Sequence, residues 1–156
     1  MDLDIMTILI DAGARIDSPD AAFFALNCLH DREGRAGKAR FLIDRGASIT
    51  AVSPRGYPIV VEAAEMGYSD VVEVLLQAGV DVNTRAPNGW TPLIAAAAQG
   101  DPVTVSLLLA HGADVTAKGA DGETALDLAR HARRTTSRVV QYEQVEILLS
   151  PDVEWR

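Results

Sequence analysis

Short apolar blocks recur along the chain at a fixed interval, and a glycine follows each of them. The blocks IMTILIDA, ARFLIDR, VVEVLLQA and VSLLLAH precede four glycines spaced 33 residues apart: Gly13, Gly46, Gly79 and Gly112. Two further glycine series keep the same spacing: Gly34, Gly67 and Gly100, and Gly56, Gly89 and Gly122. Three series with one period predict an array of repeats, each forming one supersecondary unit.

One well-preserved unit shows which elements a repeat contains. Proline is accommodated in the first turn of a helix, so Pro92 predicts a helix start, and Thr91 before it predicts an N-cap. Gly100 predicts a left-handed end to that helix, and Pro102 begins a second one. The second helix carries apolar residues at helical spacing: Val105, Leu108 and Leu109. The following segment, ADVTAKGADG, predicts a projecting hairpin.

These phrases resemble the ankyrin-repeat family. The resemblance rests on NGWTPLIAAAAQG, RGYPIVVEAAEMGYSDVVEVLLQAGVDVN and DGETALDLA, and it extends over essentially the whole chain. It implies an all-α solenoid of stacked helix-turn-helix units with projecting β-hairpin loops. Alanines in the first helix of each unit, such as Ala63, Ala64 and those at 95–97, are expected to be small because neighbouring inner helices pack closely.

The repeats predict one domain over residues 1–156. Its parts are a half repeat at 1–17, a degenerate repeat at 18–50, regular repeats at 51–83 and 84–116, and a C-terminal capping repeat at 117–156. Residues 4–10 align with an outer helix that lacks an inner partner, so self-association through this N-terminal edge is expected. The last repeat has an insertion within RHARRTTSRVVQYEQ, which is predicted to form a basic loop.

Composition narrows the function. With 22 acidic and 14 basic residues the net charge is -8, which disfavours nucleic-acid binding. No apolar run approaches the ~20 residues of a membrane helix, and a cytoplasmic location is expected. The only cysteine, Cys28, is expected in the core, and the three histidines, His30, His111 and His131, lie in different repeats. Neither metal spacing nor a phosphate-binding loop is found, so we predict a non-catalytic protein without a cofactor.

The resemblance implies that a protein partner binds the concave face, formed by hairpin tips and inner helices. Nine candidate residues occupy such positions: Arg55, Tyr57, Glu65, Met66, Asn88, Trp90, Gln99, Asp121 and Glu123. Ala98 and His131 lie at similar inner-helix positions. Tyr57 and Trp90 are expected side by side on adjacent hairpins, where aromatic residues favour binding. The alternative is that each ring stabilises its own hairpin.

A second candidate surface is basic. Four arginines cluster in an otherwise acidic chain: Arg130, Arg133, Arg134 and Arg138. Together they could bind an acidic partner or a phosphate group. A solvated loop is the alternative. The favoured function is protein–protein recognition. Other hypotheses are a regulatory module of a larger enzyme or membrane protein, and, because the repeat variants are similar to those of bacterial ankyrin proteins, a bacterial effector or toxin-neutralising protein.

Overall fold

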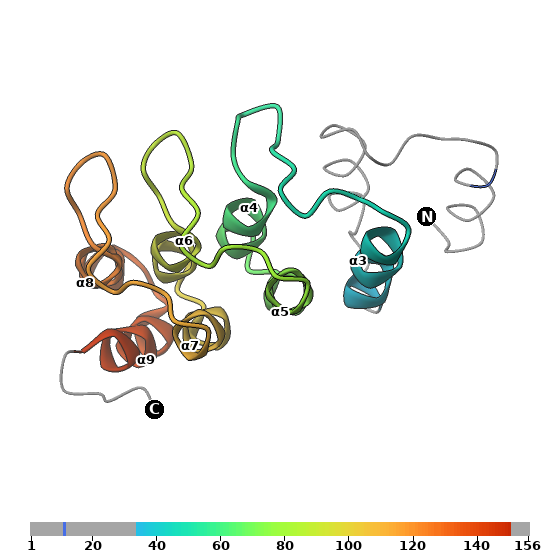
Figure 1. The fold of residues 1–156 in the computed structure, drawn as a ribbon. Helices are drawn as coiled ribbons and strands as arrows, with labels where there is room; N and C mark the ends of the chain where they lie inside the picture. Colours follow the sequence, from blue (N-terminus) through green and yellow to red (C-terminus); the bar gives the residue numbers. More distant parts are fainter. Residues whose placement is uncertain (1–10, 12–33, 151–156) are drawn as a thin grey trace.

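The helices of the computed structural model lie in two rows (Figure 1). The structure describes residue 11 and residues 34–150. One row contains the inner helices α4 (Ile59–Glu65), α6 (Pro92–Gln99) and α8 (Ala125–Thr135). The other contains the outer helices α3 (Arg35–Asp44), α5 (Ser69–Gln77), α7 (Pro102–Ala110) and α9 (Val139–Leu149). Each helix packs on its neighbours within and between the rows, so the described part is a stack of repeated helix pairs.

The boundaries of α6 and α7 follow from local chemistry. The hydroxyl of Thr91 accepts a hydrogen bond from the amide of Ile94, and Pro92 fills the first turn of α6. Gly100 ends that helix with a φ of 70°, in the left-handed region. A carboxylate oxygen of Asp101 then accepts hydrogen bonds from two amides at the start of α7. The helix ends predicted from the sequence are therefore confirmed for this repeat.

Three loops project to the same side of the stack, above α4, α6 and α8 (Figure 1). Two of them are closed by a single antiparallel bridge, Val52 with Pro58 and Lys118 with Thr124. In the middle loop the amide of Ala86 donates to the carbonyl of Trp90 at 2.9 Å. These connections are tight hairpins, and the described residues contain no longer strand.

Small aliphatic side chains fill the space between the inner helices. Ala95, Ala96 and Ala97 have no exposed surface, and Ala64 of the preceding inner helix is equally buried. Leu75 and Leu108 fill the space between the inner and outer rows in the same way. The predicted reason for the alanines is confirmed, because bulkier side chains would separate the stacked helices.

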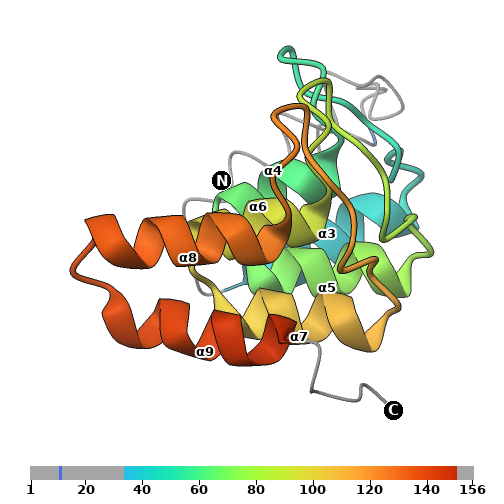
Figure 2. The same ribbon diagram turned by 90° about the vertical axis from the view of Figure 1, so that its left-hand side faces the viewer.

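The prediction of a basic loop at residues 130–138 is wrong for residues 130–135, whereas Arg138 does lie between the two helices. Helix α8 has 11 residues, whereas α4 has 7 and α6 has 8. Arg130, Arg133 and Arg134 therefore lie on a helix. The physical reason is visible in the glycine series: the position 33 residues after Gly100 holds Arg133, so no glycine ends the helix there. Figure 2 shows α8 and the 11-residue α9 extending beyond the other helices, on the side away from the hairpins.

Some expectations concern residues outside the described part. These are the half repeat at 1–17, most of the first half of the degenerate repeat, the N-terminal edge, Cys28 and His30. The division into five repeats accordingly stays a prediction.

Candidate functional site

Three of the predicted binding residues form one cluster at the first described hairpin. The guanidinium carbon of Arg55 lies 4.3 Å from the centre of the Tyr57 ring. A terminal nitrogen of the same guanidinium lies 3.5 Å from a carboxylate oxygen of Glu65, on α4. Arg55 therefore makes a cation–π contact within the hairpin and joins the hairpin to the inner helix by an ion pair. Its side chain remains 56% exposed, so the cluster faces solvent.

Beneath this cluster lies a buried polar pair that the sequence analysis did not identify. The hydroxyl of Ser53 accepts hydrogen bonds from the amides of Arg55 and Tyr57. Glu62 on α4 is only 5% exposed, and one of its carboxylate oxygens has no hydrogen-bond partner. Burial raises the pKa of Glu62, although a hydrogen bond with Ser53 and the charge of Arg55 oppose that shift. The sequence feature that indicates this buried acid is the single acidic residue within the apolar run PIVVEAA.

The second hairpin holds Trp90 in a defined position. The side-chain oxygen of Asn88 accepts a hydrogen bond from the Trp90 amide at 3.1 Å. The indole ring lies against the third hairpin, since a β-carbon placed on Gly119 would be 3.1 Å from its Cδ1 atom. Trp90 and Tyr57 are both partly buried and both pack on the core. Each ring thus has a scaffold contact, and a role in binding stays a prediction.

The second and third hairpins are joined to each other. The amide of Ala120 donates to the carbonyl of Asn88 at 2.9 Å. The guanidinium of Arg85 donates to the carbonyls of Gly89 and Lys118 at 3.0 and 2.9 Å. Gly89 has a φ of 76°, and a β-carbon there would lie 2.9 Å from the Ala120 amide nitrogen. Only glycine permits this approach, so the two hairpins behave as one unit.

The remaining candidates along this face differ in exposure. Met66 is 40% exposed at the end of α4. The Gln99 side chain lies over Gly67, at 3.6 Å from the position of a β-carbon there. Asp121 and Glu123 are exposed on the third hairpin, and no hydrogen bond or ion pair within the described part involves their carboxylates. The candidates therefore spread from the hairpin tips to the far ends of the inner helices.

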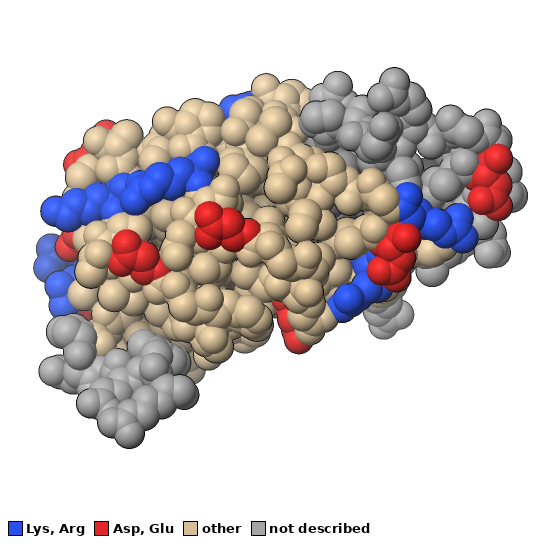
Figure 3. Space-filling model, in the orientation of Figure 1, with Lys and Arg blue, Asp and Glu red and all other residues tan. Residues whose placement is uncertain are grey.

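Charged side chains occupy few places on the side of the molecule drawn in Figure 3. A band of Lys and Arg atoms crosses the hairpin bases above α6 and α8, with acidic side chains close by. Most of the other described surface visible there carries no charge. The net negative charge is thus not spread evenly, and local patches of either sign remain available for recognition.

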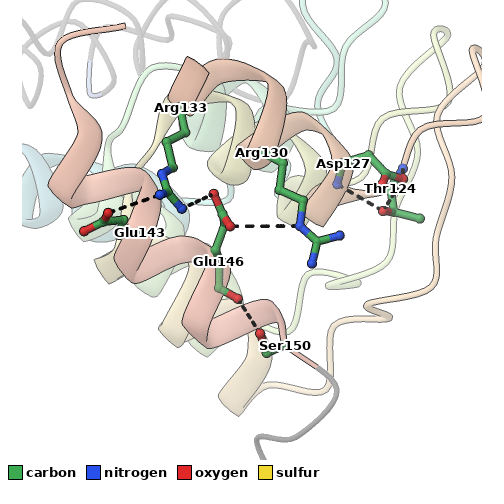
Figure 4. Close-up of polar contacts among 7 residues, drawn as sticks. All are labelled: Thr124, Asp127, Arg130, Arg133, Glu143, Glu146 and Ser150. Carbon is green, nitrogen blue, oxygen red and sulfur yellow. Dashed lines mark hydrogen bonds and ion pairs between the residues drawn. The ribbon is translucent and has the colours of Figure 1, made fainter. Parts of the chain in front are cut away.

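The basic candidates separate into two groups. Arg133 lies 3.3 Å from both Glu143 and Glu146, and Arg130 lies 3.9 Å from the second oxygen of Glu146 (Figure 4). Arg138 is not part of this group. Its guanidinium donates to the carbonyl of Gln99 at 3.3 Å and so helps to cap α6. The sequence predicted a single cluster of four arginines. The structure instead separates Arg138 from the other three.

A hollow of about 400 Å³ lies among the first group, lined by Arg130, Arg133, Arg134 and Glu146. Arg134 is exposed and makes no hydrogen bond or ion pair within the described part. The three arginines that line the hollow are paired with two carboxylates, those of Glu143 and Glu146, so one positive charge is left in excess.

Within residues 34–150, no group of three histidine, cysteine or acidic side chains could hold a metal ion. His111 is exposed at the end of α7, with its Nδ1 atom 2.9 Å from the Leu107 carbonyl oxygen, and His131 is exposed on α8. None of the described helices is both long and apolar enough to cross a membrane.

Comparison with known proteins agrees with the architecture. A family model described as ankyrin repeats, in three copies, matches residues 60–155, more than half of the 156-residue chain. A search of curated proteins finds no match. The match begins just inside α4 and continues through α9, so it includes the second and third hairpins, whereas the first hairpin precedes it.

Proposed function

Because this chain belongs to the ankyrin-repeat family, whose repeats are generally protein-interaction modules, we propose that it binds a partner protein along its hairpin tips and inner helices. The chain performs no chemistry of its own and acts in the cytoplasm. Its specificity resides in which side chains these positions carry.

The observation that carries this proposal is the repeated aromatic position on adjacent hairpins. Tyr57 and Trp90 occupy equivalent places in consecutive repeats, and both retain exposed surface. The hairpins stand in one row (Figure 1), so a partner lying along that row would meet both rings. Large, rigid aromatic side chains supply contact area at low entropic cost, and they are common among the residues that dominate binding energy.

Rigidity of the hairpins supports the same proposal. Arg85 and the Asn88 carbonyl connect the second hairpin to the third. Arg55 holds the first hairpin against α4. A surface that is already ordered loses little conformational entropy on binding, so more of the contact energy contributes to affinity.

The experiment is quantitative affinity capture from the native cell, followed by titration of the captured protein against purified variants. Trp90→Ala removes the central aromatic ring but also a packing contact on Gly119. A second variant, Asp121→Asn with Glu123→Gln, alters only exposed side chains that have no partner in the described part. Val103→Ser, on the outer helix α7 where Val103 is 64% exposed, is the matched control.

We expect a partner that binds wild type and Val103→Ser with equal affinity, and that binds both hairpin variants at least about fivefold more weakly. Thermal unfolding of each variant separates lost affinity from lost structure. Equal affinity for all four proteins would place the binding surface elsewhere and reject the proposal.

A further inference from the structure

We propose that the hollow on α8 is a second docking site, which takes an acidic segment of a partner protein. It is lined by the C-terminal half of α8 and by Glu146 of α9. None of these residues belongs to a hairpin tip, so the site does not depend on the surface proposed above. Figure 2 shows these two helices extending away from the hairpin row. We call this site the arginine groove; it is lined by Arg130, Arg133, Arg134 and Glu146.

The arginine groove carries more positive charge than its own ion pairs require. Arg133 is engaged by Glu143 and Glu146, both at 3.3 Å. Arg130 lies 3.9 Å from Glu146 and is 55% exposed, so this pair is weak in water. Arg134 makes no hydrogen bond or ion pair within the described part. Two guanidinium groups are therefore available to an incoming anion.

Helical spacing brings the available groups together. Arg130, Arg133 and Arg134 are separated by three and four residues, so their side chains lie on one face of α8. Glu146 lies between Arg130 and Arg133 (Figure 4), and its closer contact, at 3.3 Å, orients the Arg133 guanidinium beside the other two. Pre-positioned guanidinium groups bind carboxylates with directed, paired hydrogen bonds.

The extension of the last repeat creates this groove. Arg133 occupies the position where the preceding repeat has Gly100 and ends its helix, and Arg134 follows it. A purely terminal role, shielding the end of the stack, explains a charged residue at position 130 but not two more beyond the usual helix end. Charge on the last turn of a helix is itself favourable, yet that effect is modest at exposed sites.

Apolar surface beside the groove favours a protein segment over a free ion. Val140 is 63% exposed and lies one helical turn before Glu143, on the same side of α9. Val139 next to it is 40% exposed. An acidic peptide with an apolar neighbour could contact both the guanidinium groups and these valines, whereas an inorganic anion would use only the charges.

The test uses the whole chain and short labelled peptides of defined chemistry. A peptide of six glutamates is titrated at low ionic strength, with six glutamines as the neutral control. Binding is followed by fluorescence anisotropy and by the NMR signals of the arginine Nε–H groups. The variants are Arg134→Gln and Arg130→Gln. Lys118→Gln, which removes one exposed positive charge from the third hairpin, is the matched control.

We expect the glutamate peptide to shift the Nε–H signals of Arg130 and Arg134, and to bind about three- to tenfold more weakly to Arg134→Gln. Lys118→Gln should retain wild-type affinity, and added salt should weaken binding. Because Arg134 makes no hydrogen bond or ion pair within residues 34–150, its variant should unfold close to the wild-type temperature. An equal loss in Lys118→Gln would mean unspecific attraction and would overturn the proposal.

Two further probes define the ligand. A peptide with phosphoserine in place of glutamate tests the other common source of oxyanions, and binding of that peptide alone would overturn the assignment to carboxylates. A single-stranded oligonucleotide tests nucleic acid. Oligonucleotide binding that is lost in Arg134→Gln, without peptide binding, would overturn the assignment to a protein partner.

Discussion

Helix α6, in the middle of the stack, buries six of its eight residues, whereas α8 in the last repeat buries only Ala125 and Ala129 of eleven. The two helices share a sequence pattern and a fold, but α6 has an inner helix on both sides and α8 has one on a single side. Position in the stack, as much as local sequence, therefore sets which side chains the helix can carry.

The last described repeat, whose inner helix packs on one other described inner helix, has specific polar contacts of its own. Thr124 and Asp127 form a reciprocal capping box at the start of α8. Tyr142 reaches back to α6, where its hydroxyl donates to the carbonyl of Ala98 at 2.7 Å. Arg138 caps the neighbouring Gln99 carbonyl. The middle repeat is held mainly by close packing, and the last one by packing on one side together with these bonds.

Exchanging one residue between the two helices is the strongest test of this difference. Ala97 has no exposed surface, and the equivalent position in α8 is Arg130. Ala97→Arg would force an unpaired charge and a long side chain between α6 and α8, so we expect a loss of about 4 kcal/mol or more in unfolding free energy. Denaturant unfolding followed by circular dichroism measures it.

The reverse exchange is its control. Arg130→Ala should change the unfolding free energy by no more than about 0.5 kcal/mol, because its ion pair is exposed. Equal costs for the two exchanges would mean that neighbours do not determine what each helix tolerates.

A substitution at Gly100, where the two repeats meet, should cause the next largest loss of stability. Its φ of 70° strains any other residue, and a β-carbon there would lie 2.7 to 2.9 Å from the Tyr142 ring. We expect Gly100→Ala to cost about 2 to 4 kcal/mol in unfolding free energy, from backbone strain and overpacking together.

A substitution at Gly112 separates the cost of backbone strain from the cost of overpacking. It has a φ of 82°, but a β-carbon there would have no neighbouring atom within 4 Å, so Gly112→Ala should cost only the strain, about 1 to 2 kcal/mol. Replacing Tyr142 with leucine in the Gly100→Ala background should recover part of the difference. If both glycine variants were equally unstable, the ring contact would be irrelevant.

The Tyr142 hydroxyl is expected to contribute less. Tyr142→Phe keeps the ring over Gly100 but leaves the Ala98 carbonyl without this donor, and we expect a loss of about 1 kcal/mol. Hydrogen exchange should report faster opening at the end of α6 and little change in α5. Unchanged exchange throughout would show that water replaces the hydroxyl without cost.

Much of this architecture is predictable because it rests on short-range rules. Thr91, Pro92 and Gly100 define α6 through capping chemistry that involves only neighbouring residues. Contacts between repeats are harder to predict. The sequence explains Gly100 as a helix end, but its second role, making room for Tyr142, joins residues 42 positions apart. The separation of Arg138 from the other arginines likewise depends on a contact with Gln99 in another repeat.

The candidate binding face was only partly predictable for the same reason. The 33-residue spacing places Tyr57 and Trp90 on equivalent positions, but it does not reveal that Arg55 stacks on one ring and Gly119 lies under the other. Helix propensity could have corrected the loop expectation at residues 130–135, because arginine and alanine favour helix and no glycine interrupts that segment.

Replacing either of two carboxylates, Asp127 or Glu62, should have the smallest effect on the unfolding free energy. The two replacements should change stability in opposite directions at neutral pH. Hydrogen bonds with the Thr124 hydroxyl and backbone amide lower the pKa of Asp127. Its contribution is therefore present above its unfolded pKa, near 3.8, and is lost as the pH falls through the lower folded value. Asp127→Asn should cost a few tenths of a kcal/mol at neutral pH, about what exposed caps contribute, and nothing in strong acid.

Glu62 behaves in the opposite way, because burial raises its pKa above the usual 4.5. A raised folded pKa favours the folded state below the unfolded value, and this advantage disappears as the pH rises through the folded value. Glu62→Gln should therefore raise stability at pH 7 relative to wild type, and the gain should shrink at pH 4. Thermal unfolding from pH 3 to pH 8 compares both variants. If the stability of both variants changed with pH in the same way, Glu62 would not behave as a buried acid and Asp127 as an exposed helix cap.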